Sequence, residues 1–148
     1  MRAFGAVVSA AAAAAVTMLI TAAAASGDQG QRTIWEGVYS EAQAVRGQRG
    51  YAQACAKCHA EDLLGAGNAP PLVGEPFLGR FDRASADDVV LVVRQTMPQE
   101  APDSLGSETY VDIVSYLFKA NGSPAGPSDL PVDRATLKQV LVTSKEAR

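Results

Sequence analysis

Five consecutive residues carry most of the chemistry that this sequence offers, the run CAKCH at positions 55–59. It has the pattern C-x-x-C-H, in which two thiols form thioethers with the vinyl groups of a haem and the histidine follows directly, placed to reach the iron. Cys55 and Cys58 are the only cysteines of the chain, and His59 is its only histidine. We therefore expect one covalent haem c, attached through Cys55 and Cys58, with its iron bound by His59.

Other uses of these three residues explain the pattern less well. A zinc ion would need a fourth ligand, and the chain has no second C-x-x-C. A disulfide between Cys55 and Cys58 would close a very small loop and leave His59 unexplained. A thioredoxin-like redox pair would need a βαβ pattern around the cysteines, which the sequence lacks.

The iron of such a haem has a second axial position, and the chain has no second histidine to fill it. Lysine, methionine or an open position remain. Met1 and Met18 fall in the N-terminal leader, so Met97, 38 residues after His59 and directly before Pro98, is the one methionine left. A lone methionine can simply fill a gap in a core. Beside a haem motif, we favour Met97 as the sixth ligand of the iron.

The first 25 residues have the composition of a secretory signal peptide. Arg2 is the only charge before Asp28, and an alanine-rich apolar run extends from Ala3 to Ala25. We expect cleavage near Ala25, after small residues that suit a signal peptidase, and export to a bacterial periplasm. The alternative is an uncleaved segment that anchors the chain in the inner membrane, because the run is about long enough to span a bilayer.

Removal of the leader leaves about 120 residues, the size of one small domain. These residues contain 12 Lys and Arg against 16 Asp and Glu, a net charge near −4. A nucleic-acid partner would need a basic face, so we exclude that class of function. We divide the chain into a signal peptide (1–25), an N-terminal linker and packed arm (26–39), a central domain (40–122) and a C-terminal extension (123–148).

The first predicted helix leads into the haem motif. Ser40 is its N-cap, Gln43 completes a capping box, and the helix runs on into Cys55. Gly47 and Gly50 weaken this helix, each by about 1 kcal/mol relative to alanine. Two glycines on one helix indicate either a kink or a place where another backbone comes close.

Two more helices are predicted in the central domain. Ser85 begins one that ends before Pro98, although its run of five aliphatic residues could equally form a buried strand. Acidic residues in its first turn, where the helix dipole favours them, make us prefer the helix. Ser107 caps the other helix, which continues to Ala120 and stops at Asn121.

The remaining segments are predicted to be irregular. Residues 33–39 are expected to pack on the domain as an extended arm. Residues 60–83 form a long loop that wraps around the haem, with a short helical turn near Phe77. Residues 123–131 have the Pro, Gly and Ser content of a linker, and residues 133–142 form an amphipathic piece that docks on the domain. We find no convincing sheet.

Several features occur in a fixed order along residues 40–122. A glycine and an aromatic residue precede the first cysteine by eight and four positions, a P-x-L-x-G element follows the histidine, and the last helix carries an aliphatic residue, two spacers and Tyr-Leu. The positions are Gly47, Tyr51, Pro70–Gly74, Ile113, Tyr116 and Leu117. Together with the haem motif, this arrangement resembles that of the class I, single-haem cytochromes c.

The resemblance implies an all-α cytochrome c fold, in which the N- and C-terminal helices cross and loops wrap around one covalent haem. It assigns Pro70 and Leu72 to cofactor binding. In the family, the carbonyl of the first proline accepts a hydrogen bond from the imidazole, which makes Pro70 the partner expected for Nδ1–H of His59. Such a bond fixes the ring and raises the basicity of the ligand.

The sequence departs from the family pattern near the haem propionates. Many members place a tryptophan there, and the equivalent here is Phe81, which has no N–H to donate. Arg80 or Arg83 could replace the tryptophan as a cationic partner, although an arginine is more often simply solvated surface.

Two segments that flank the central domain resemble one particular group of cytochrome c domains. WEGVY at residues 35–39 and NGSPAG at residues 121–126 are similar to segments of bacterial cytochrome c domains associated with pyrroloquinoline-quinone-dependent alcohol dehydrogenases. The similarity suggests a quinoprotein dehydrogenase as a partner.

We interpret the chain as an electron carrier and not as an enzyme. With both axial positions occupied, one electron enters at the haem edge and is passed on between redox partner proteins, such as a quinoprotein dehydrogenase and a terminal oxidase. The alternative is a haem peroxidase or a gas-binding sensor with a labile sixth ligand. That reading needs distal acid–base groups, and no second histidine exists to serve as one.

Overall fold

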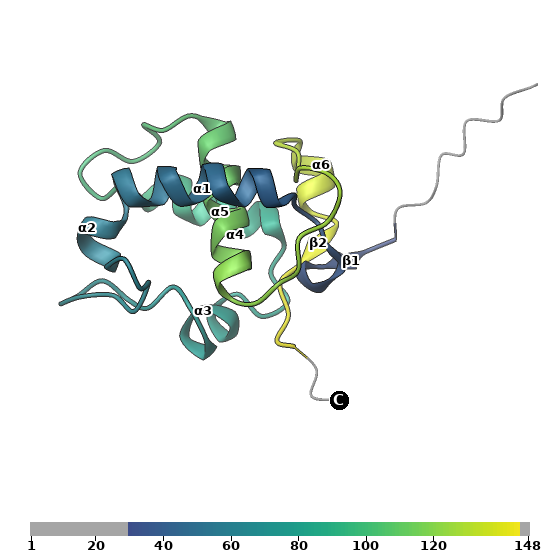
Figure 1. The fold of residues 1–148 in the computed structure, drawn as a ribbon, viewed down its shortest axis with the longest axis horizontal. Helices are drawn as coiled ribbons and strands as arrows, with labels where there is room; N and C mark the ends of the chain where they lie inside the picture. Colours follow the sequence, from purple (N-terminus) through teal and green to yellow (C-terminus); the bar gives the residue numbers. More distant parts are fainter. Residues whose placement is uncertain (1–29, 146–148) are drawn as a thin grey trace, which may run out of the picture.

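The computed structural model describes residues 30–145, and two crossing helices lie at its centre (Figure 1). These helices are α1 (Glu41–Ala54) and α5 (Ser107–Ala120), which pack against each other over much of their length. The signal peptide predicted over residues 1–25 lies outside the described residues. Among the described residues, no helix is both long and apolar enough to cross a membrane.

The close crossing of α1 and α5 depends on a glycine. A Cβ atom on Gly47 would lie 1.8 Å from the carbonyl oxygen of Asp112, so any side chain there would overlap the backbone of α5. At Gly50, a Cβ atom would lie 3.1 Å from the side chain of Ile113. The prediction that a second backbone comes close to this helix is confirmed at Gly47, whereas Gly50 meets a side chain.

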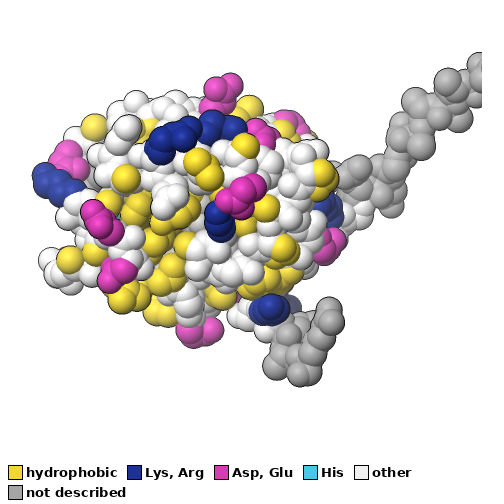
Figure 2. Space-filling view, in the orientation of Figure 1, with side chains coloured by type: hydrophobic (Ala, Val, Ile, Leu, Met, Phe, Trp, Pro, Cys, Tyr) yellow, Lys and Arg dark blue, Asp and Glu magenta, His cyan; other side chains and the backbone are white. Residues whose placement is uncertain are grey.

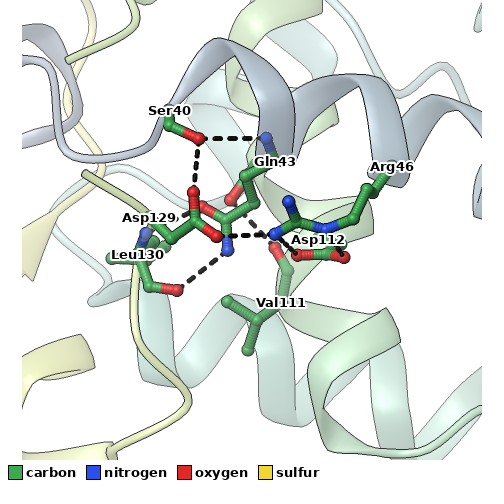
Figure 3. A network of polar contacts seen from close by, with 8 residues as sticks. Ser40, Gln43, Arg46, Val111, Asp112, Asp129 and Leu130 are labelled. Atoms are coloured by element: carbon green, nitrogen blue, oxygen red, sulfur yellow. Dashed lines mark hydrogen bonds and ion pairs between the residues drawn. The ribbon is translucent and has the colours of Figure 1, made fainter. Parts of the chain in front are cut away.

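The N-terminus of α1 is capped as expected, but the capping box is incomplete. The Ser40 hydroxyl accepts a hydrogen bond from the Gln43 backbone N–H at 3.0 Å. The Gln43 side chain does not turn back to Ser40. Its amide group instead donates to the carbonyl of Leu130 at 2.9 Å and accepts from the N–H of Leu130 at 2.7 Å (Figure 3). A buried glutamine thus satisfies both backbone groups of a residue 87 positions away.

The apolar run after Ser85 forms a helix, α4 (Ala86–Thr96), and not a strand. The Ser85 hydroxyl accepts from the Asp88 N–H at 3.2 Å, and the Asp88 carboxylate accepts from the Ser85 N–H at 2.9 Å. These hydrogen bonds hold the pKa of Asp88 below its ordinary value. Val89 and Val90 are buried, and α4 packs against α5.

The start of α5 differs from the prediction by one residue. Ser107 is its first helical residue, and the N-cap is Gly106, whose φ of 80° lies in the left-handed region. No side chain caps this end. Glycine occupies the position because it adopts a positive φ at little cost. The helix ends at Asn121, as expected.

Two short helices lie at one end of the crossing pair, α2 (Ala56–His59) and α3 (Glu75–Arg80). Helix α3 is the short turn predicted near Phe77. Residues 60–74, which join the two helices, form no regular element. In Figure 1, α2 and α3 lie on the left and below, and the elements near the two ends of the described chain lie on the right.

The elements on the right of Figure 1 are β1 (Arg32–Thr33), the 3-10 helix η1 (Ile34–Glu36), α6 (Arg134–Leu137) and β2 (Val140–Leu141). The two strands are parallel, with Arg32 opposite Val140 and Thr33 opposite Leu141. The expectation of no sheet is therefore wrong. Residues 33–39 do pack on the domain, but as a turn of 3-10 helix and not as an extended arm.

Residues 123–131 are fixed to the domain at a few buried points, although their composition predicted a linker. Ser123 is 4% exposed, its carbonyl accepts a hydrogen bond from the Tyr39 hydroxyl, and its own hydroxyl donates to the carbonyl of Ile34. The N–H of Gly126 donates to the carbonyl of Tyr39 at 2.6 Å. Burial raises the pKa of Tyr39 to about 12. We call residues 32–40 and 123–142 together the clasp.

The last part of the clasp is fixed to α4. The Arg134 guanidinium donates two hydrogen bonds to the Asp87 carboxylate, at 2.9 and 2.8 Å. The N–H of Val142 donates to the carbonyl of Ala84 at 2.8 Å, and Leu137 is buried. The predicted docking of residues 133–142 is confirmed, although only their first half is helical.

Candidate haem site

The haem motif occupies the junction between α1 and α2. Cys55 ends α1, with its N–H donating to the carbonyl of Tyr51 at 2.8 Å, and Cys58 and His59 belong to α2. The Cys58 side chain is exposed, Cys55 is half-buried and His59 is only 5% exposed. The break between the two helices thus leaves the thiols accessible to different degrees while the imidazole is enclosed.

His59 is oriented by the carbonyl of Pro70, which lies 3.0 Å from its Nδ1. A carbonyl can only accept a hydrogen bond, so Nδ1 is the donor, and in the neutral ring Nε2 keeps its lone pair. An unprotonated imidazole nitrogen is a common metal ligand, and the partner of the other nitrogen fixes the tautomer. This is the hydrogen bond that the resemblance implied.

The loop that brings Pro70 to His59 turns at a glycine. Gly65 has a φ of 78°, and a Cβ atom there would lie 2.2 Å from the carbonyl oxygen of Ala69. The N–H of Gly65 donates to the carbonyl of His59 at 3.0 Å, and the N–H of Leu72 donates to the carbonyl of Leu63 at 2.8 Å. These bonds fold the loop back beside the histidine.

Met97 lies at the C-terminal end of α4, where its N–H donates to the carbonyl of Val93 at 2.8 Å. Its carbonyl accepts a hydrogen bond from the Tyr110 hydroxyl at 2.8 Å. Tyr110 is fully buried in α5, so the backbone of Met97 is fixed to the central helix pair.

Two cavities meet around these residues, one of about 400 Å³ and one of about 330 Å³. Both are in the size range of small-molecule and cofactor sites. They share four lining residues: Cys55, His59, Pro70 and Met97. The one histidine and the described methionine therefore border the same space as the first cysteine. Cys58 lines the first cavity and Leu72 the second.

The second cavity has mainly apolar walls, formed by side chains such as Phe77, Phe81 and Val93. In Figure 2, hydrophobic side chains are gathered below α1, between α2 and α3. The hydroxyls of Tyr51 and Thr96 also border this cavity, but they donate to the carbonyls of Ala60 and Val92. The polar groups on its walls are thus largely engaged within the protein.

Arg80 is the one arginine or lysine that lines the second cavity. Its guanidinium lies 5.8 Å from the ring centroid of Phe81, and it forms no ion pair with any residue between 30 and 145. Arg83, the alternative cation, lines neither of the two cavities, and its side chain is 88% exposed. Of the two arginines, only Arg80 can meet a group held in the cavity.

The chemistry of the cysteines also suits attachment of a cofactor. Burial raises the pKa of the Cys55 thiol to about 11. The cysteines of thiol–disulfide oxidoreductases have lowered pKa values, because the thiolate is their reactive form. A half-buried thiol with a raised pKa beside an apolar cavity is therefore unlike the nucleophile of a redox pair.

The residues around the two cavities fit a haem. The cavity walls are apolar where a porphyrin would lie, the two thiols stand at one edge, and an imidazole and a thioether border the shared space. A crossing pair of terminal helices above such a site is the arrangement of a c-type cytochrome domain.

The comparison with protein families agrees with this class. The family model described as cytochrome C oxidase, cbb3-type, subunit III matches residues 42–117, just over half of the chain, and the chain belongs to this family. The protein is an all-α c-type cytochrome, and it carries one haem c with iron, attached through Cys55 and Cys58. The searches of curated proteins and of solved structures found no match.

The structure brings all six candidate residues together around the two cavities: Cys55, Cys58, His59, Pro70, Leu72 and Met97. Sequence reasoning missed other wall residues. Val92 and Val93 lie about one helical turn before Met97, and this spacing could have identified them. Asn68 has no comparable signal, because its place in the wall depends on the fold of an irregular loop. The hydrogen bond from Tyr110 to Met97 also had no local signal.

Proposed function

We propose that the protein is an exported, single-haem electron carrier whose iron is bound between Nε2 of His59 and the thioether sulfur of Met97. The observation that supports this function is the position of these two residues, which border both cavities together with Cys55. When bound, the haem supplies one-electron exchange at its iron. The protein needs only to hold it, exclude water and present an edge to partners.

The ligands have distinct roles in this proposal. The hydrogen bond from Nδ1 of His59 to Pro70 holds the ring in one orientation and raises the basicity of Nε2. Met97 supplies a soft, neutral thioether, which favours ferrous iron and raises the reduction potential. The hydrogen bond from Tyr110 holds the backbone of Met97 beside the cavities.

Arg80 is the residue that would meet a haem propionate. The thioethers tie the vinyl edge of the porphyrin to the cysteines, and the propionates are attached on the opposite side of the ring. Cys58 lines only the first cavity, whereas Arg80 lines only the second. The apolar walls leave the Arg80 guanidinium as the charged partner for a carboxylate there.

The partners that we propose are a quinoprotein dehydrogenase as electron donor and a terminal oxidase as acceptor. The similarity of residues 35–39 and 121–126 to dehydrogenase-associated domains supports the first, and the name of the family model supports the second. The net charge near −4 after loss of the leader gives a mild preference for basic docking surfaces. Transfer in the periplasm follows from the predicted signal peptide.

The proposed function is tested in two steps on the purified protein. A haem stain after denaturing electrophoresis first checks covalent attachment, which C55S/C58S should abolish. The ferric protein should then show the weak near-infrared band of sulfur-to-iron coordination, and Met97→Ala should remove it. An unchanged band in Met97→Ala would exclude Met97 as the ligand. Tight binding of carbon monoxide or cyanide by the unmodified protein would instead favour the sensor or peroxidase.

A further inference from the structure

The loop that carries Met97 has few anchors. It runs from Met97 to Gly106 between α4 and α5, and residues 99–104 are all exposed. Leu105 packs partly against the core, and Tyr110 holds the carbonyl of Met97. Between these two points, Asp103 holds the loop to α4, and the carboxylate of Glu100 lies 4.0 Å from the exposed ammonium of Lys57 in α2.

Asp103 and Arg94 are joined by both side-chain and backbone hydrogen bonds. The Arg94 guanidinium donates two hydrogen bonds to the Asp103 carboxylate, one from Nε to Oδ1 and one from Nη2 to Oδ2 at 3.1 Å. The N–H of Asp103 donates to the carbonyl of Arg94 at 2.9 Å. A third guanidinium contact reaches the hydroxyl of Ser107 at 3.4 Å. Arg94 therefore holds both the middle and the far end of the loop.

The backbone of Asp103 is held in an uncommon conformation. Its φ of 62° lies in the left-handed region, which costs free energy for any residue other than glycine. Such a residue persists where the surrounding contacts over-determine it. Here the contacts that do so are the two side-chain hydrogen bonds and the backbone bond to Arg94.

We propose that Arg94 and Asp103 are positioning residues for Met97, which keep its loop closed and so limit the exchange of the sixth ligand of the haem iron. The proposal rests on the proposed ligation by Met97. The Arg94–Asp103 pair closes a ring of ten residues that contains Met97, so Met97 cannot move far from the cavities while the pair is intact. When the pair opens, an external ligand can replace the thioether on the iron.

The test is an imidazole titration of the ferric holoprotein, followed by its visible spectrum. As imidazole binds, its nitrogen forms a bond to iron and the bond from iron to the Met97 sulfur breaks, with no electron transferred. Exposed ion pairs contribute up to about 1 kcal/mol, which corresponds to about fivefold in an equilibrium constant, so we expect Arg94→Gln and Asp103→Asn each to raise the imidazole affinity by up to about fivefold. The double variant should bind no tighter than Arg94→Gln, because both substitutions remove the same pair and Arg94→Gln also removes the contact with Ser107.

The chain offers a matched control in Arg46→Gln. Arg46 also donates two hydrogen bonds to an aspartate, Asp112, and its side chain is 42% exposed, the same fraction as that of Arg94. Arg46 does not contact the loop that carries Met97. Arg46→Gln should lower the melting temperature and leave the imidazole affinity unchanged, which separates loop opening from general destabilisation.

Met97→Ala gives the imidazole affinity of the haem protein when the thioether ligand is missing. Weak binding by the unmodified protein, tighter binding by Arg94→Gln and Asp103→Asn, and the tightest binding by Met97→Ala would support the proposal. Equal affinities of the unmodified protein and the two loop variants, with Met97→Ala tighter, would overturn it and leave Met97 ligation intact. Equal affinities of the unmodified protein and Met97→Ala would overturn both.

Discussion

The clasp differs from the opposite end of the molecule, which carries the haem motif and which we call the haem end, in what its side chains pack against. In the clasp, Ile34, Tyr39 and Val142 are fully buried against protein, and their neighbours are joined by hydrogen bonds within the chain. At the haem end, α2, α3 and the loop between them line two open cavities of about 400 and 330 Å³, together with residues of α4 and α5. The haem end continues from α1 at Cys55, whereas the clasp packs on α4 and is bonded to α1 through Gln43 and Leu130 (Figure 1).

Because one end packs against protein and the other lines cavities, we expect the two ends to be stabilised by different contacts. The clasp is held by contacts between parts of the chain that are about 90 residues apart, such as Ser123 with Ile34. The walls of the haem end face a space that the cofactor fills, so much of their burial is against haem. The clasp should therefore tolerate loss of haem, and the haem end should tolerate loss of clasp contacts.

The largest effect is expected when the haem is removed by C55S/C58S. Without haem, apolar side chains that line the second cavity, such as Phe77 and Val93, would lose the surface on which they pack and would face water, which costs about 25 cal/mol per Å² of apolar surface. The haem end should therefore lose its order. Hydrogen exchange should show residues 60–80 unprotected and the clasp protected. Equal loss of protection at both ends would contradict the claim that the clasp is stable without haem.

A smaller effect is expected from Gly126→Ala in the clasp. A Cβ atom on Gly126 would lie 1.9 Å from the carbonyl oxygen of Gly37, so the two backbones would have to separate. Overpacking of this kind costs about 1–3 kcal/mol. Denaturant melting should show this loss of stability, while the visible spectrum of the haem stays the same.

The control for this variant is Gly30→Ala. Among the atoms of residues 30–145, none lies within 4 Å of a Cβ at Gly30, and its φ is not in the left-handed region. The substitution should leave the melting curve unchanged. A changed haem spectrum in Gly126→Ala would show that the two ends are coupled more strongly than their contacts suggest.

The haem end was largely predictable from the sequence, because its signals are local. The motif at residues 55–59 fixes the attachment, and caps such as Ser85 fix the helix that ends at Met97. The PPLVG element implied the hydrogen bond from His59 to Pro70, which the structure contains. In each case, the informative residues lie within a few positions of the feature that they specify.

The clasp was not predictable in the same way, because its contacts join distant residues. Residues 123–131 have a linker composition, yet Gly126 is needed for the approach to Gly37 and Leu130 is bound by Gln43. The bond to Leu130 also diverts the Gln43 side chain from the capping box that its spacing predicted. Local composition does not reveal such partners, and the same holds for the pairing of Arg94 with Asp103.

The smallest effect is expected from Asp129→Asn, which tests whether the charged part of the clasp adds to its packing. Hydrogen bonds from Ser40 and Arg46 hold the pKa of Asp129 below its ordinary value (Figure 3). A lowered pKa means that the carboxylate stabilises the fold fully above its unfolded pKa of about 3.9, and that this contribution is lost as pH falls through the folded pKa.

The unmodified protein should therefore be more stable than Asp129→Asn at pH 7, by less than about 1 kcal/mol because the carboxylate is half exposed. The difference should shrink as pH falls below about 3.9, because the carboxylate of the unmodified protein is protonated as pH passes through its lowered folded pKa. Denaturant melts over a pH series measure it, with Glu61→Gln as a control, since Glu61 forms no side-chain hydrogen bond or ion pair with residues 30–145. A difference that stayed constant along the pH series would assign the effect to packing instead of charge. The charge on Asp129 would then add nothing to the other hydrogen bonds and the packing of the clasp.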